Sequence, residues 1–308
     1  MSPFVPVPAD APLRLLTVHA HPDDEASKGA STVAQLHSEG VHCVLVCCTG
    51  GEAGDVLNPD MDVPEVHADL PGVREVELAR AAEIIGYDEV VMLGYRDSGM
   101  KDSEHNVRSD AFANADLDEA VGRLVAIIRR VRPQVLVTYP DARGEYDHPD
   151  HVQVHDVSVP AFHAAGDPGR YPEAGPAWQP SKLYYTMWSR ARIAGLHEKF
   201  LELGIESPYD EWWFKRPSRD HLITTQVPVG EHWDVRGDAL RAHATQIDPA
   251  SPFWFGLPDD VARTVHPFDD YRLAALCVDG RPVDPSTHLP TGGLEEDLFA
   301  GLRAEVSA

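Results

Sequence analysis

The sequence has no long apolar run and contains only 4 cysteines in 308 residues. A membrane-spanning helix needs about 20 consecutive apolar residues, so we expect none. The N-terminal stretch lacks the basic region and apolar run of a secretory signal peptide, which favours a cytoplasmic protein. Cys43, Cys47 and Cys48 lie in one strand-like segment in which neighbouring side chains point to opposite faces, and Cys277 is isolated. We therefore predict buried, reduced thiols and no disulfide framework.

Basic residues are also scarce. The chain has 26 Lys and Arg against 50 Asp and Glu, which gives a formal net charge of −24. Such a surface repels the phosphates of nucleic acids and anionic membranes, so we predict neither as a partner. No long acidic block stands out, and the excess of acid is typical of a well-solvated surface.

Short apolar segments alternate with helical patterns in the first half of the chain, which predicts an α/β fold with a Rossmann-like, mostly parallel sheet flanked by helices. We expect a catalytic core over residues 1–180. Residues 181–308 are expected to pack on this core, to complete the site and not to fold independently. The expected strands are at 13–19, 42–49, 89–94, 134–139 and 182–188, and the expected helices at 32–40, 74–85, 117–132, after His151, 191–203 and 235–247.

Two motifs follow predicted strands at the edge where open α/β sheets bind ligands. HPDDE starts at His21 after the first strand, and HPDH ends at His151 after the fourth. His21, Asp24 and His151 together supply two imidazoles and a carboxylate. Three protein ligands leave a coordination position free, which is typical of a catalytic metal site. Zn²⁺ suits these donors, and Fe²⁺ accepts the same set.

Neighbours of these ligands are placed to act on a substrate. Asp23 lies next to a ligand without binding the metal, which is where a general base for an activated water belongs. His148 lies three residues before His151 and would face the substrate, where it could protonate a departing amine or stabilise charge. Either motif alone is also compatible with a turn or a capped helix start. The presence of both at the ends of strands of one predicted sheet favours a metal site.

The segments HAHPDDE, TGGEAGD and YDHPDH, in this order, resemble the LmbE-like (PIG-L type) family of metal-dependent N-deacetylases. The resemblance implies zinc bound by His21, Asp24 and His151, with Asp23 as the general base. It also implies roles for four groups of residues: Tyr146 in polarising the amide carbonyl, His148 in assisting the tetrahedral intermediate, Asp150 in orienting a neighbouring histidine, and Glu52, Arg74 and Asp97 in contacting sugar and inositol hydroxyls.

Within this family the sequence is most similar to the enzymes of mycothiol metabolism. The segment SKGA, which contains Lys28, is similar to the amidase of mycothiol S-conjugates, whereas YRDSGM at 95–100 is similar to the deacetylase of mycothiol biosynthesis. We therefore expect an amidase that releases glucosaminyl-inositol from an N-acetylcysteine S-conjugate, with Lys28 contacting the cysteinyl arm.

The alternatives are the N-acetylglucosaminyl-inositol deacetylase and a related amidase that acts on a mycothiol adduct in natural-product biosynthesis. A carbohydrate-binding protein without catalysis is disfavoured, because a binder needs neither a complete ligand set nor an adjacent base. The expected partner is a small pseudo-disaccharide thiol conjugate, and the sequence leaves a homo-oligomer open.

Overall fold

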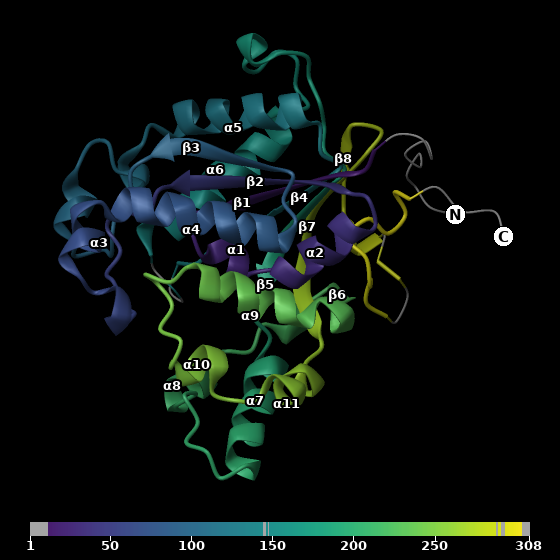
Figure 1. Cartoon of the computed structure of the whole chain (residues 1–308). Coiled ribbons are helices and arrows are strands. Elements are labelled where there is room, and N and C mark those ends of the chain that lie inside the picture. Colours follow the sequence, from purple (N-terminus) through teal and green to yellow (C-terminus); the bar gives the residue numbers. More distant parts are fainter. Residues whose placement is uncertain (1–11, 144–145, 147, 288, 291–292, 304–308) are drawn as a thin grey trace.

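The computed structural model describes residues 12–143, 146, 148–287, 289–290 and 293–303. Within these ranges one mixed sheet runs through the molecule in the order β3-β2-β1-β4-β5-β7-β6, and β8 pairs with β7 (Figure 1). The first five strands are parallel, and this confirms the predicted α/β sheet. The strands are β1 (Arg14–His19), β2 (His42–Thr49), β3 (Glu89–Tyr95), β4 (Val135–Thr138), β5 (Lys182–Met187), β6 (Thr225–Pro228), β7 (Phe268–Val278) and β8 (Arg281–Val283).

Helices cover both faces of the sheet because successive side chains of the buried central strands point to opposite sides. On one face Leu16 and Val18 of β1 pack with α5 and α6, and on the other Leu15 packs with α2, α4 and α9. Figure 1 shows these two layers above and below the strands. The helices are α1 (Asp24–Ser27), α2 (Ala30–Ser38), α3 (Pro64–Ala68), α4 (Leu70–Ile85), α5 (Leu117–Val131), α6 (Pro149–Ala164), α7 (Arg190–Glu202), α8 (Glu211–Lys215), α9 (Trp233–Ala242), α10 (Pro252–Phe255) and α11 (Asp259–Val265).

The second half of the chain contributes directly to this sheet. β5 pairs in parallel with β4 and antiparallel with β7, and β7 continues to β6. The buried Lys182 of β5 donates to Glu295, 2.9 Å away, which ties the C-terminal segment to the sheet. A division at residue 180 would cut between β4 and β5. That residues 181–308 do not fold independently remains a prediction.

Local signals explain several element boundaries. Asp116 caps α5 by accepting a hydrogen bond from the Glu119 amide, as its side chain is suited to do. Two expectations are corrected: α6 begins at Pro149 rather than after His151, and α9 ends at Ala242 rather than continuing to residue 247. All four cysteines are free and buried. Among the described helices, none combines the length and apolarity that crossing a bilayer requires.

Candidate metal centre

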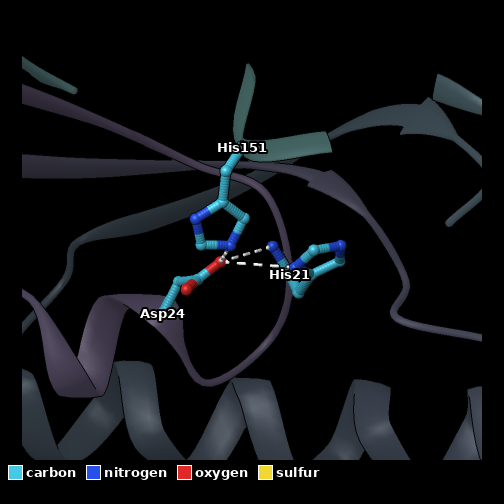
Figure 2. Close-up of side chains that lie close together, drawn as sticks. All are labelled: His21, Asp24 and His151. Carbon is cyan, nitrogen blue, oxygen red and sulfur yellow. Dashed lines mark hydrogen bonds and ion pairs between the residues drawn. The ribbon is translucent and has the colours of Figure 1, made fainter. Parts of the chain in front are cut away.

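Three donor atoms converge at the carboxyl ends of β1 and β4. His21 lies just after β1, Asp24 begins α1 and His151 lies in the first turn of α6. Asp24 Oδ2 is 3.5 Å from His21 Nδ1 and 3.3 Å from His151 Nε2 (Figure 2). The three residues are buried, and their potential ligand atoms lie within 4.8 Å of one another. The structure thus brings the predicted ligand set together.

The loop after β1 has an unusual backbone that points these groups inward. Asp23 has a φ of 112°, which places it in the left-handed region. Only glycine enters that region at no cost, but Asp and Asn do so more readily than other residues. The turn is closed by the His21 amide, which donates to Asp24 Oδ2 at 3.0 Å. The local sequence therefore fixes His21 and Asp24 on the same side of the loop.

The other ring nitrogen of His21 is held by carboxylates. Its Nε2 is 3.1 Å from Asp150 Oδ2 and 3.4 Å from Asp97 Oδ1. Asp150 is fully buried and also accepts from the Ser98 amide at 2.9 Å and from the Ser98 hydroxyl. A carboxylate on the distal nitrogen orients a ligating histidine and makes it more basic. Ser98, which the sequence analysis did not single out, supports this arrangement.

The electrostatics of the cluster suit a cation. Burial alone would lower the pKa of His21, but hydrogen bonds with Asp150, Asp24 and Asp97 raise it well above its usual value. Burial lowers the pKa of His151, which favours the neutral imidazole that binds metals. Two imidazoles and a carboxylate fit Zn²⁺ or Fe²⁺. His21, Asp97 and His148 form a second buried group of potential metal ligands, which uses the same His21 ring. On the Nε2 side of that ring, however, Asp150 Oδ2 already lies 3.1 Å away.

Asp23 lies beside the ligand set, and its side chain is 29% exposed. Burial and the neighbouring Asp24 charge raise the pKa of Asp23 to about 6. Its carboxylate accepts from Arg74 Nη2 at 3.2 Å, and Arg74 also donates to the carbonyls of Pro22 at 2.6 Å and Gly51 at 2.5 Å. Arg74 is only 2% exposed. Through these contacts Arg74 holds the loop of Asp23 in place. The predicted contact of Arg74 with substrate hydroxyls stays a prediction.

A buried pair from distant parts of the chain supports the same loop. Glu25 accepts from the Asp23 amide at 2.9 Å, and its other carboxylate oxygen lies 2.5 Å from His243 Nε2. Glu25 and His243 are both fully buried. The sequence analysis assigned no role to either residue. Glu25 is the last residue of the HPDDE motif. No sequence pattern indicates its contact with His243, which lies 218 positions further along the chain.

His148 and Tyr146 lie next to the histidines of the cluster. His148 Nδ1 accepts from the Asp150 amide at 3.2 Å at the start of α6, so Nε2 carries the proton of the neutral ring. Burial and the charges of His21 and His151 lower the pKa of His148 to about 4. Tyr146 is 52% exposed, with its ring centroid 5.0 Å from that of His151. Both side chains can face a substrate.

The remaining predicted residues surround the cluster. The Lys28 ammonium contacts Asp24 Oδ1, the carboxylate oxygen that does not face the histidines. Glu52 accepts from the Asp97 amide at 2.9 Å, and Asp97 accepts from the Gly99 amide at 2.8 Å. Burial would raise the pKa of Asp97, but its contact with His21 holds it below its usual range. The substrate contacts predicted for Lys28, Glu52 and Asp97 stay predictions.

Comparison with known proteins identifies the family. The family described as PIG-L, GlcNAc-PI de-N-acetylase, matches residues 16–162. A mycothiol S-conjugate amidase from Streptomyces coelicolor is 42% identical over 300 residues, which cover 94% of this chain and 98% of the relative. The chain belongs to the PIG-L family. A 1D-myo-inositol 2-acetamido-2-deoxy-alpha-D-glucopyranoside deacetylase from Geodermatophilus obscurus is 41% identical over 301 residues, covering 94% of this chain and 98% of the relative.

Solved structures agree on the fold of this PIG-L protein. The N,N'-diacetylchitobiose deacetylase from Pyrococcus horikoshii has a TM-score of 0.58 at 16% identity, covering 84% of this chain and 83% of that one. A 4-carboxy-2-hydroxymuconate hydratase from Pseudomonas putida has a TM-score of 0.53 at 18% identity, covering 86% and 98%. Since a deacetylase and a hydratase share the fold, the fold alone does not fix the reaction. The two relatives of about 40% identity confirm the prediction of an amide hydrolase.

Proposed function

We propose that the protein is a zinc-dependent amidase of mycothiol S-conjugates, which releases glucosaminyl-inositol and an N-acetylcysteine S-conjugate. The observation that carries this proposal is the buried donor set of His21, Asp24 and His151 with the exposed edge of Asp23 beside it. The similarity to a mycothiol S-conjugate amidase over almost the whole chain supports the choice of substrate. The same similarity supports a small-molecule substrate.

His21, Asp24 and His151 would hold a divalent cation, which when bound would act as a Lewis acid that polarises the carbonyl and lowers the pKa of water to about 7. Asp23 takes the proton of the attacking water. Burial and the neighbouring Asp24 charge raise the pKa of Asp23 above its usual value, which makes its carboxylate a better proton acceptor. Arg74 and Glu25 keep this carboxylate in place through the contacts described above.

His148 and Tyr146 stabilise the charge that develops on the carbonyl oxygen. The Nε2 proton of neutral His148 and the hydroxyl of Tyr146 donate to the oxygen that gains charge as water adds to the carbonyl carbon. The C–N bond then breaks, and the departing amine takes the proton that Asp23 accepted. The acyl carbon keeps the hydroxyl of the water, so the products are a carboxylic acid and the free amine.

The second candidate is the deacetylase that removes acetate from N-acetylglucosaminyl-inositol, and the relative at 41% identity favours it. Incubation of the purified protein with a mycothiol S-conjugate and with N-acetylglucosaminyl-inositol, followed by measurement of amine release, separates the two. We expect the larger kcat/KM on the conjugate. A larger kcat/KM on the acetylated compound would reverse the assignment, and no amine release from either would contradict both.

Lys28 is the residue that we expect to discriminate between these substrates. Its side chain is 22% exposed, contacts Asp24 and lines a hollow at the carboxyl end of β5. Replacing it with serine removes a charged donor, and a lost charge-assisted hydrogen bond of about 1.5 to 3 kcal/mol corresponds to about a tenfold to hundredfold change. Lys28→Ser should lower kcat/KM for the conjugate by this factor relative to N-acetylglucosaminyl-inositol.

Two measurements test this reading of Lys28. Lys215→Ser, at a lysine in α8 whose side chain is 76% exposed, is the matched control and should leave both kinetic constants unchanged. The metal content of each variant is determined in parallel. Equal losses on both substrates with a lower metal content would mean that Lys28 supports Asp24 and does not select the substrate.

A further inference from the structure

His243 is a buried histidine from the second half of the chain that reaches the loop of the proposed general base. It follows α9, which packs against α1, α2 and α4 (Figure 1). Its Nε2 lies 2.5 Å from Glu25 Oε1, and the other oxygen of that carboxylate accepts from the Asp23 amide at 2.9 Å. Two consecutive contacts therefore connect His243 to the backbone of Asp23.

The contact between Glu25 and His243 has the character of a buried ion pair. Both side chains are fully buried. Burial would raise the pKa of Glu25, but the charge of His243 holds it below its usual value. Burial would likewise lower the pKa of His243, but the charge of Glu25 and their hydrogen bond raise it. Because an unpaired carboxylate is strongly unfavourable in the interior, the ionised form of Glu25 depends on His243.

The stability of the fold alone does not explain an imidazole at position 243. The Nδ1 atom of His243 is buried and has no hydrogen-bond partner among the described residues. A buried polar atom without a partner costs about 1 to 3 kcal/mol. The polar contact that the ring does make within the described part of the chain is the one with Glu25. This points to a role at the loop that Glu25 supports.

The backbone that carries His243 is fixed from several sides. The His243 amide donates to the Leu240 carbonyl at 3.1 Å, and the His243 carbonyl accepts from the Gln246 amide at 3.0 Å. Two positions further on, Thr245 is fully buried and donates to Glu77 of α4 through its amide at 2.8 Å and its hydroxyl at 2.7 Å. His243 therefore gives Glu25 a rigid support.

The loop of Asp23 needs such a support. Asp23 has a φ of 112°. A residue other than glycine in such a conformation costs about 1 to 3 kcal/mol, and the conformation persists only where surrounding contacts fix it. The Glu25 carboxylate holds the amide of this same residue. Without that contact the backbone would relax, and the Asp23 carboxylate would turn with it.

We propose that His243 is a positioning residue of the active site: by holding Glu25, it fixes the backbone of Asp23 and aims the Asp23 carboxylate at the attacking water. This inference rests on the proposed function, in which Asp23 is the general base. It gives the second half of the chain a part in catalysis as well as in the sheet. His243 acts through Glu25 and is not a member of the donor set.

The test measures kcat, KM and bound metal in two variants, with the mycothiol S-conjugate or, if it is the better substrate, N-acetylglucosaminyl-inositol. His243→Leu removes the contact with Glu25. Its kcat should fall about tenfold to hundredfold, since displacing a reacting group by about 1 Å can cost about a hundredfold. KM should stay within about twofold, because substrate binding is unchanged, and the metal content should be that of the wild type. His243→Gln can still donate to Glu25 and should recover most of the kcat.

Thr245→Val is the matched control. It removes a buried hydrogen bond from the same turn, but one that reaches α4 and not the loop of Asp23. It should lower the Tm and leave kcat unchanged, whereas His243→Leu should lower kcat. A similar loss of kcat in both variants would mean that the turn only supports the fold.

A double-mutant cycle with Asp23→Asn isolates the positioning role. In that background His243→Leu should change kcat by less than about twofold, because no base remains to be positioned. Equal losses with and without Asp23 would overturn the role of His243 while the proposed function stood. A loss of metal, or an unchanged kcat in His243→Leu alone, would overturn it as well.

A further variant guards against misfolding. His243→Leu leaves the buried Glu25 carboxylate without a partner, whereas Glu25→Met combined with His243→Leu replaces the ion pair by apolar side chains, an exchange that proteins often tolerate. The combined variant should show the same loss of kcat, and a wild-type kcat would refute the inference. If the wild type released amine from neither substrate, the proposed function itself would fail, and the inference with it.

Discussion

Asp23→Asn is expected to retain nearly all of its metal and to lose kcat by about 10² to 10⁴, the usual contribution of a positioned general base. The carboxylate of Asp23 lies outside the donor set of His21, Asp24 and His151, so the ligands are unchanged. The amide of asparagine keeps the size and shape of the side chain but does not accept the proton of water. Metal content by elemental analysis and kcat at saturating substrate and metal are the two measurements.

Asparagine is the appropriate replacement here because of the backbone. At a φ of 112° alanine would add strain to the loop, whereas asparagine tolerates left-handed geometry nearly as well as aspartate. Asp62→Asn provides the control, since the Asp62 side chain is 64% exposed and pairs only with His67 among the described residues. A wild-type kcat in the Asp23 variant would show that another group takes the proton. A loss of metal would show that Asp23 helps to hold the ligand loop.

The sheet and the convergence of His21, Asp24 and His151 were predictable because their signals are local. The apolar segments of β1, β2 and β4 are buried on both faces and read as continuous hydrophobic runs in the sequence. His21 and Asp24 are three residues apart after one strand, and His151 follows another. Because parallel strands end at the same edge, the sequence placed these ligands together without any knowledge of long-range contacts.

The rest of the site depends on contacts between distant segments. His243 and Glu25 are separated by 218 positions, and Ser98 and Asp150 by 52. Strands β6 and β7 were not predicted, because they are antiparallel additions to a sheet whose preceding pattern is parallel.

His151→Ala is expected to lose metal and activity together, in contrast to Asp23→Asn. The substitution leaves His21 Nδ1 and Asp24 Oδ2 as the only two members of the set, and two donors hold a divalent ion weakly. We expect metal affinity to fall by more than about a hundredfold, which exceeds the usual effect of losing a partner that only orients a ligand. Elemental analysis after dialysis measures the bound metal, and the rate of amine release measures the activity.

The control lies one turn further along the same helix. His155 of α6 is half-buried and hydrogen-bonds through Nδ1 to the Tyr139 carbonyl at 3.0 Å, outside the donor set. His155→Ala should therefore keep its metal and most of its activity. Added Zn²⁺ should raise the Tm of the wild type and of His155→Ala, because a ligand that binds only the folded state stabilises it, but it should leave the Tm of His151→Ala unchanged. Full metal content in His151→Ala would remove this histidine from the ligand set and leave the site to the neighbouring group of His21, Asp97 and His148.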